Sequence, residues 1–218
     1  MNSANKLLTV FILVSACYIT AIALNIEALV FYVKPLLMLP LLIGVSVSTN
    51  FRYKYILVIA LAFSWAGDIL LLFVFKNEVY FILGLIAFLF AHISYIILFN
   101  KELNKANGKI DLKKASLIPI TIYLVTLLSV LVPHLGSLTF PVILYAVVIC
   151  AMLYMACVLG SHWSKPYSGL LISGAISFIL SDSILAFDKF YHSLPLAGIL
   201  IMSTYLYAQW ALVKSCLR

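Results

Sequence analysis

Charged residues are scarce in this sequence. Only 10% of its 218 residues are Asp, Glu, Lys or Arg, whereas 65% are hydrophobic. Soluble globular proteins have about a quarter charged and about half apolar residues. A water-soluble fold of this composition would expose apolar side chains over most of its surface. The composition therefore excludes a soluble protein and favours one embedded in a lipid bilayer.

Long polar segments are equally scarce. The polar breaks delimit eight apolar stretches, each close to the ~20 residues that a helix needs to cross a bilayer. They predict transmembrane helices over residues 7–25, 30–49, 55–75, 79–99, 113–132, 138–160, 168–187 and 194–214. We therefore predict an all-α fold, a polytopic membrane helix bundle of eight transmembrane helices that forms one integral membrane domain, residues 1–218.

One longer polar interruption, near residues 100–114, predicts a loop between the fourth and fifth helices. It divides the chain into two four-helix halves. Asp68 and Asp182 fall in the third helix of each half, both about fourteen residues, or roughly 21 Å, from its expected start. This match is consistent with two parallel four-helix repeats, since an even number of helices restores the chain direction. It is too short to distinguish a duplication from a coincidence.

The basic residues indicate the orientation, because Lys and Arg concentrate in cytoplasmic loops. With the N-terminus inside, eleven of the fourteen fall in inner segments: Lys6, Arg52, Lys54, Lys101, Lys105, Lys109, Lys113, Lys114, Lys165, Lys214 and Arg218. This predicts that both termini are cytoplasmic. It also accounts for the net charge of +7 without a nucleic-acid partner. A small cationic membrane protein of this kind fits the inner membrane of a bacterium.

Metal-binding motifs are absent from the sequence. The four cysteines, at positions 17, 150, 157 and 216, have no CxxC spacing, and no HxxxH or HExxH occurs. We therefore expect neither a cofactor nor a metal. A metal held by Asp68, Asp182 and His92 is an alternative, because two carboxylates and an imidazole are competent ligands.

Two acidic residues lie inside apolar stretches, Asp68 after Phe63-Ser64-Trp65-Ala66-Gly67 and Asp182 after Ser181. A carboxylate there costs roughly 2.5–3.5 kcal/mol on insertion scales and usually lines a cavity or a polar pathway. Both are therefore candidate functional residues. An ion pair with Lys34 is a structural alternative, although one lysine cannot neutralise two carboxylates.

Further polar residues share helix faces with these acids. Ser64 is one helical turn before Asp68, while Ser173, Ser177 and Ser181 form a stripe at i, i+4 spacing. A second stripe, expected to face the bundle interior, comprises Gly84, Phe88, His92 and Tyr95. Serines in membrane helices often bond only to the preceding carbonyls, and a lone histidine often only links helices, so structural roles remain open.

The chain resembles the YhhN-type lysoplasmalogenase family of integral membrane proteins, and the resemblance extends over essentially its whole length. The residues that carry it are Lys34-Pro35, Ser64, Gly67-Asp68, Gly84, Phe88, Ala91-His92, Tyr95, Pro141, Tyr145, Gly174-Ala175, Phe178, Ser181-Asp182, Tyr205 and Ala208-Gln209. Each motif is weak alone. Their order on successive helices makes the combination specific.

The resemblance implies hydrolysis of the vinyl ether bond of a lysoplasmalogen within the bilayer. The products would be a fatty aldehyde and glycerophosphocholine or glycerophosphoethanolamine. Such a reaction needs one carboxylic acid that keeps its proton and a second carboxylate that stabilises a cation and activates water. Asp68 and Asp182 are the expected catalytic pair. The expected supporting or substrate-binding residues are Lys34, Ser64, His92, Tyr95, Tyr145, Ser181, Tyr205 and Gln209.

Two other functions fit the same residues. In a proton-coupled membrane transporter, Asp68, Asp182 and His92 would form a relay, which predicts proton flux and no aldehyde release. In a purely structural protein, the aspartates would only pair helices. The sequence does not indicate which aspartate is the acid, the preferred head group or the oligomeric state.

Overall fold

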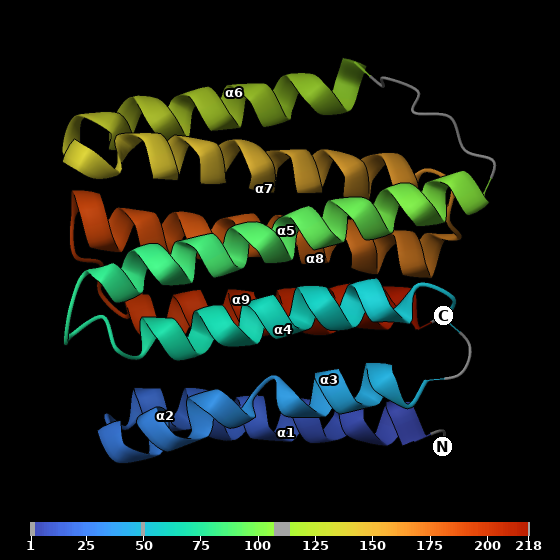
Figure 1. Cartoon of the computed structure of the whole chain (residues 1–218), viewed down its shortest axis with the longest axis horizontal. Helices are drawn as coiled ribbons and strands as arrows, with labels where there is room; N and C mark the ends of the chain where they lie inside the picture. Colours follow the sequence, from blue (N-terminus) through green and yellow to red (C-terminus); the bar gives the residue numbers. More distant parts are fainter. Residues whose placement is uncertain (1–2, 49–50, 107–113, 218) are drawn as a thin grey trace. The chain divides into compact units, whose positions relative to one another are not determined.

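The computed structural model describes residues 3–48, 51–106 and 114–217, and these residues form helices joined by short turns (Figure 1). The all-α prediction is confirmed for these ranges. The helices are α1 Ser3–Ala23, α2 Glu27–Val33, α3 Leu39–Ser46, α4 Lys54–Leu71, α5 Val79–Lys105, α6 Lys114–Leu131, α7 Thr139–Gly160, α8 Lys165–Ala186 and α9 Ala197–Cys216.

Seven helical segments of the described residues are long and apolar enough to cross a membrane. They correspond to the first seven predicted spans, with α2 and α3 together forming the second. The eighth prediction, 194–214, is confirmed as a helix of 20 residues, α9. Polar residues such as Gln209 make α9 less apolar than these seven segments. Its length is sufficient to cross a bilayer, and the crossing itself stays a prediction. The chain is an integral, multi-pass membrane protein.

The loop predicted near residues 100–114 begins later than expected. Helix α5 continues through Asn100 to Lys105, because Glu102 and Leu103 in this stretch are buried and hold the helix against its neighbours. The central part of the predicted loop, residues 107–113, lies outside the described residues. Scarcity of apolar residues is therefore a poor guide to where this helix ends.

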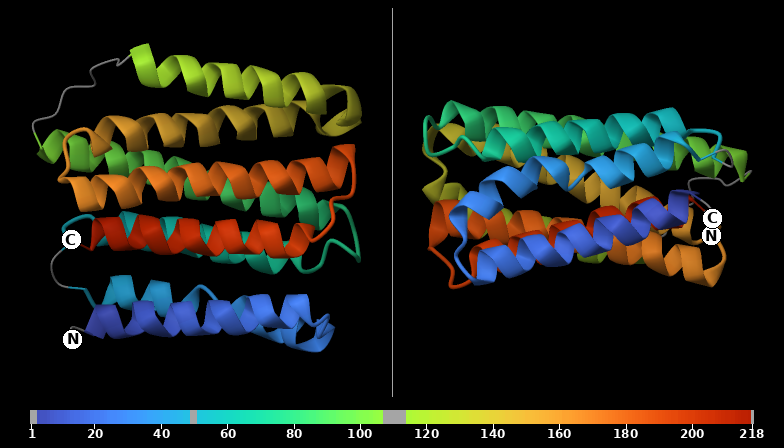
Figure 2. Two further views of the ribbon diagram at one scale, coloured as in Figure 1. Left: turned by 180° about the vertical axis from the view of Figure 1, so that it is seen from behind. Right: turned by 90° about the horizontal axis from the view of Figure 1, so that it is seen from below.

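The second predicted span, 30–49, is a broken helix. Helix α2 ends at Val33, a 3-10 turn follows over Lys34–Leu36, and α3 starts at Leu39 with Pro40 in its first turn. Figure 2 shows this interrupted segment beside α1, which contacts both of its halves. Pro40 has no N–H to donate to the Leu36 carbonyl, as a continuous helix would require. The break thus places Lys34 in a short 3-10 turn between two α-helices, within a membrane span.

The chain divides into two compact units, which are described separately. The first contains Met1–Leu98 with Cys216–Arg218, and the second contains Phe99–Ser215. The single domain 1–218 therefore stays a prediction.

In the first unit, α1 packs on α2 and α3, and α3 packs on α4. Helices α4 and α5 approach closely at two glycines. A Cβ at Gly67 would lie 2.6 Å from the Phe88 ring, and one at Gly84 would lie 2.9 Å from Leu71. Small residues at helix contacts in membranes allow such close approach. These glycines fix the position of α4, which carries Asp68.

In the second unit, α7 packs on both α6 and α8 (Figure 1). Helix α8 also pairs with α9, where the hydroxyl groups of Ser177 and Ser181 donate to the carbonyls of Thr204 and Ile201 at 2.9 and 3.0 Å. A π-helical turn, Phe187–Tyr191, follows α8. Because α8 begins at Lys165 rather than Ser168, Asp182 lies farther along its helix than the 21 Å predicted, about 26 Å.

Candidate functional site

Asp182 is held by a tyrosine on the neighbouring helix. The Tyr145 hydroxyl on α7 donates a hydrogen bond to Oδ2 of Asp182 on α8. Tyr145 is 8% exposed and Asp182 is half-buried, so the bond lies at the edge of the helix contact. A hydrogen bond to an ionised carboxylate is stronger than one between neutral groups. This phenol therefore orients the carboxylate.

A second tyrosine approaches the same carboxylate from α6. The hydroxyl groups of Tyr123 and Ser183 are hydrogen-bonded, and the Ser183 hydroxyl donates to the Ile179 carbonyl at 2.6 Å. Because Ser183 has only one hydroxyl proton, Tyr123 is the donor in their shared bond. Tyr123 also lies within electrostatic range of Asp182. Three helices thus contribute hydroxyl groups around Asp182.

These polar groups line a small pocket in the second unit. Its volume is about 30 Å³, which is room for about one water molecule. Asp182, Tyr145, Tyr123 and Ser183 supply its polar atoms, and Val142, Ile149 and Ala186 are among the apolar residues. The site therefore offers a carboxylate and three hydroxyl groups to a small polar reactant.

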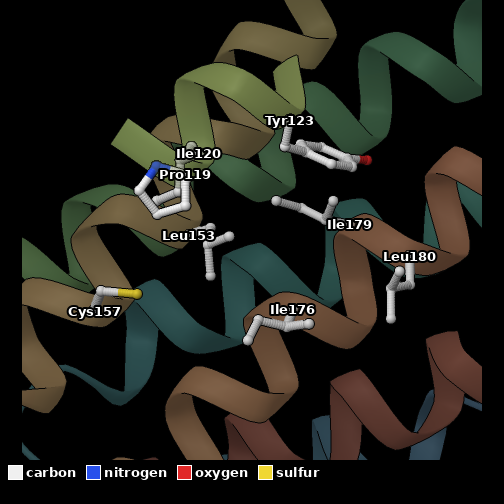
Figure 3. Close-up of a pocket in the computed structure, with 8 residues that line it drawn as sticks. All are labelled: Pro119, Ile120, Tyr123, Leu153, Cys157, Ile176, Ile179 and Leu180. Atoms are coloured by element: carbon white, nitrogen blue, oxygen red, sulfur yellow. The ribbon is translucent and has the colours of Figure 1, made fainter. Parts of the chain in front are cut away.

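An apolar groove of about 390 Å³ adjoins this pocket. Tyr123 and Ile179 line both spaces. Figure 3 shows the residues of the groove, which come from α6, α7 and α8: Pro119, Ile120, Tyr123, Leu153, Cys157, Ile176, Ile179 and Leu180. The groove has the size of a ligand pocket, roughly 300–1,000 Å³. It offers apolar surface next to the Asp182 carboxylate.

Asp68, in the first unit, is almost completely buried at 2% exposure. Lys34 and Tyr18 both lie within electrostatic range of its carboxylate. A cation close to a buried carboxylate offsets part of the cost of removing that charge from water. The structure therefore supports an interaction of Lys34 with Asp68, the structural alternative that the sequence offered.

The broken second span positions Lys34. In a continuous helix the Pro35 carbonyl would accept from residue 39, but here the indole N–H of Trp65 donates to it at 2.6 Å. Buried backbone groups in a membrane need such partners wherever a helix is interrupted. Trp65 lies on α4, three residues before Asp68. The same helix therefore carries the carboxylate and fixes the turn that carries its cation.

The other candidates of the first unit are buried. Ser64, His92 and Tyr95 each have 0% exposure, and Gly84 and Phe88 of the predicted stripe are buried as well. The inward orientation of that stripe is confirmed. The Ser64 hydroxyl has no hydrogen-bond partner among the residues that the structure describes. Its position one turn before Asp68 suits a role beside that carboxylate.

Of the remaining candidates of the second unit, Ser181 and Tyr205 lie at the contact between α8 and α9. Ser181 donates to the Ile201 carbonyl, and Tyr205 packs edge-on against Phe178 with ring centroids 5.5 Å apart. Gln209 is fully buried on α9. Ser181 and Tyr205 thus support α8, the helix that carries Asp182.

Sequence reasoning missed three residues around the acids: Tyr18, Tyr123 and Ser183. Each lies in an apolar span, and only the serine had a signal, its position directly after Asp182. The tyrosines come from helices with no predicted site residue. Within the described ranges no group of three or more His, Cys, Asp or Glu side chains is arranged to hold a metal ion.

The YhhN family model matches residues 29–216. The chain belongs to the YhhN family. Mouse lysoplasmalogenase TMEM86B is 34% identical to it over 139 residues, which cover 63% of this chain and 54% of the mouse protein. Human lysoplasmalogenase TMEM86B is 33% identical over 141 residues, with coverages of 63% and 54%.

Bovine lysoplasmalogenase TMEM86A is 30% identical over 166 residues, 72% of this chain and 63% of that protein. The YhhN chain spans about half the length of its mouse and human relatives. These relatives are named as enzymes and not as transporters, so the transporter alternative has no support from them. No solved structure matches the chain.

Proposed function

We propose that this chain is a lysoplasmalogenase that hydrolyses the vinyl ether bond of lysoplasmalogens in the bilayer. The products would be a fatty aldehyde and glycerophosphocholine or glycerophosphoethanolamine. The observation that carries the proposal is the Asp182 carboxylate, oriented by Tyr145 and placed beside an apolar groove. The names of the mouse, human and bovine relatives support the same reaction.

The reaction requires proton transfer to carbon. A carboxylic acid protonates the β-carbon of the vinyl ether, which leaves an oxocarbenium ion at the α-carbon. A carboxylate then takes a proton from water as the water oxygen bonds to the α-carbon, giving a hemiacetal. Its collapse breaks the bond to the glycerol oxygen, which takes up a proton, and releases the aldehyde. Paired carboxylates share work of this kind in glycosidases.

We assign the two carboxyl groups to Asp182 and Asp68. Asp182 lines a pocket large enough for a water molecule, which suits the carboxylate that stabilises the cation and activates water. Asp68 is assigned the second carboxyl group, the proton donor, on chemical grounds, and Lys34 would stabilise the anion that remains after the proton is transferred. The scheme requires no cofactor.

The remaining candidates have supporting roles in this proposal. Tyr145 orients Asp182, and Ser64 lies one turn before Asp68 on the same helix. His92 and Tyr95, which are buried in the first unit, are proposed to orient the catalytic aspartates or to adjust their protonation. Ser181, Tyr205 and Gln209 hold α8 against α9 or contact the substrate.

We further propose a cytoplasmic position for both termini and residence in a bacterial inner membrane. The distribution of lysines and arginines supports the orientation. The substrate would enter sideways from the lipid, because its cleaved bond lies where the hydrocarbon chain meets the polar head group.

Aldehyde release from the purified protein tests the proposal. Detergent-solubilised protein would receive a lysoplasmalogen or the matching lyso-ester lipid, in parallel with Asp68→Asn and Asp182→Asn. We expect aldehyde from the vinyl ether alone, and loss of turnover in both variants while their circular dichroism stays helical. No aldehyde from folded wild-type protein would refute the activity. Normal turnover in one variant would remove that aspartate from the mechanism.

A further inference from the structure

We infer that the apolar groove on α6, α7 and α8 binds the single hydrocarbon chain of the substrate and sets its preferred length. This inference rests on the proposed function and adds a binding site to it. The groove and the Asp182 pocket are adjacent, because Tyr123 and Ile179 line both. A chain lying in the groove therefore has its reactive end next to the carboxylate.

The length of the site matches one chain of a membrane lipid. Figure 3 shows Tyr123 and Cys157 on opposite sides of the groove. Along α7, Cys157 lies twelve residues from Tyr145, an axial distance of about 18 Å. One leaflet of a bilayer accounts for about 15 Å of its hydrocarbon core. The site thus accommodates one chain from the reacting carbon to near its methyl end.

The size of the groove favours a single hydrocarbon chain over larger occupants. Its volume of about 390 Å³ is too small for a packed helix, whose diameter is about 10–12 Å. It also provides one apolar space, whereas a diacyl lipid has two chains to place. None of the residues that line the groove has a charge that could bind a head group. A lysolipid, with one chain, fits this geometry.

The first test narrows the groove at its far end. Cys157→Phe is compared with wild type on lysoplasmalogens whose chains have 10 to 18 carbons, and Val147→Phe, an exposed position on α7 outside the groove, is the control. We expect kcat/KM to fall about tenfold for every two methylenes that the new ring excludes, with the shortest substrate unaffected. An unchanged dependence on chain length in folded Cys157→Phe would overturn the inference.

A second test measures binding without turnover. In a chain carrying Cys17→Ala, Cys150→Ala and Cys216→Ala, the one remaining thiol, Cys157, is modified with N-ethylmaleimide and followed by mass spectrometry. The probe is a saturated 1-O-alkyl lysophospholipid, which has no double bond to protonate. Dioleoyl phosphatidylethanolamine is the control lipid.

Modification should slow about tenfold when the ether lysolipid is present at about ten times its Kd, with no effect of the diacyl lipid. Equal modification rates, or equal protection by both lipids, would overturn the groove as a substrate site. This result does not depend on catalysis. Protection by the ether lysolipid, together with no aldehyde from lysoplasmalogen in the activity assay, would refute the proposed reaction and retain the binding site.

Discussion

Tyr145 on α7 donates its hydroxyl proton to Asp182 on α8, and both residues line one small pocket. The bond joins two of the most extensively packed helices of the second unit. Its position means that the orientation of the carboxylate depends on the contact between α7 and α8. The phenol ring can be kept while its hydroxyl is removed, which makes the relationship testable.

Tyr145→Phe should lower kcat by roughly 10- to 100-fold, because a hydrogen bond to a charged group is worth about 1.5–3 kcal/mol. KM should change little, since the ring remains in place. Steady-state aldehyde release measures both quantities. Tyr154→Phe is the matched control on α7, because the Tyr154 hydroxyl is buried and has no partner among the described residues. Equal kinetics in the two variants would contradict a role for the Tyr145 hydroxyl.

Lys34→Met should destabilise the protein by about 1–3 kcal/mol when Asp68 is ionised, because it then leaves the buried Asp68 carboxylate without its cation. Lys34 is half-buried, which keeps the loss below that of a fully buried pair. Adding Asp68→Asn should restore part of the stability. Unfolding midpoints in detergent measure this double-mutant cycle. Strictly additive effects would mean that the two side chains do not interact.

Trp65→Phe should lower stability by about 1–3 kcal/mol, because the Pro35 carbonyl then loses its donor at the helix break. Activity should fall with it, since the adjacent Lys34 loses its fixed position. Trp210→Phe on α9 controls for the general loss of an indole. If both variants have the same midpoint and activity, the bond to Pro35 does not hold the break in place.

Gly67→Ala should destabilise the protein by about 1–3 kcal/mol, because the new methyl group overlaps the packed Phe88 ring. Gly169→Ala on α8 is the control, since nothing lies within 4 Å of a Cβ there. It should be neutral or stabilising by up to about 1 kcal/mol, the difference in helix propensity. Thermal melts followed by circular dichroism compare them. A stable Gly67→Ala would mean that α4 and α5 can separate at no cost.

Ser181→Ala should reduce stability by about 0.6 kcal/mol, the average for an interhelical hydrogen bond in a membrane protein. Ser129→Ala is the control, because the Ser129 hydroxyl bonds only within α6. We expect kcat to remain within about twofold of wild type, because Ser181 bonds to Ile201 rather than to the carboxylate. A kcat loss without a stability loss would instead place Ser181 in the reaction.

The sequence predicted the helices well because their apolar runs are long and end at clear polar residues. It predicted the wrong start for the loop after α5, since buried Leu103 follows polar residues that resemble a loop. It predicted one helix over residues 30–49, whereas the structure breaks this span at Lys34–Leu36. A proline is well placed in the first turn of a helix, so Pro40 begins α3.

The candidate site was predictable only in part. A carboxylate in an apolar run is visible in the sequence because of its cost, and Asp68 and Asp182 were found on that basis. The tyrosine donors around them were not found on that basis, because tyrosine is common in membrane helices. Which tyrosine points at Asp182 depends on the rotation of α6 and α7 about their axes. The apolar groove had no sequence signal, since its lining residues resemble those that face lipid.

The broken second span also constrains how the chain enters the membrane during synthesis. Helices α2 and α3, of 7 and 8 residues, are each about 10–12 Å long, and neither can cross a 30 Å core alone. A nascent chain with only one half inserted would leave Lys34 and open carbonyl groups in the hydrocarbon. Both halves must therefore enter together, supported by α1, which contacts each of them. The insertion machinery would handle α1 and this broken span together as one helical hairpin rather than as successive single helices.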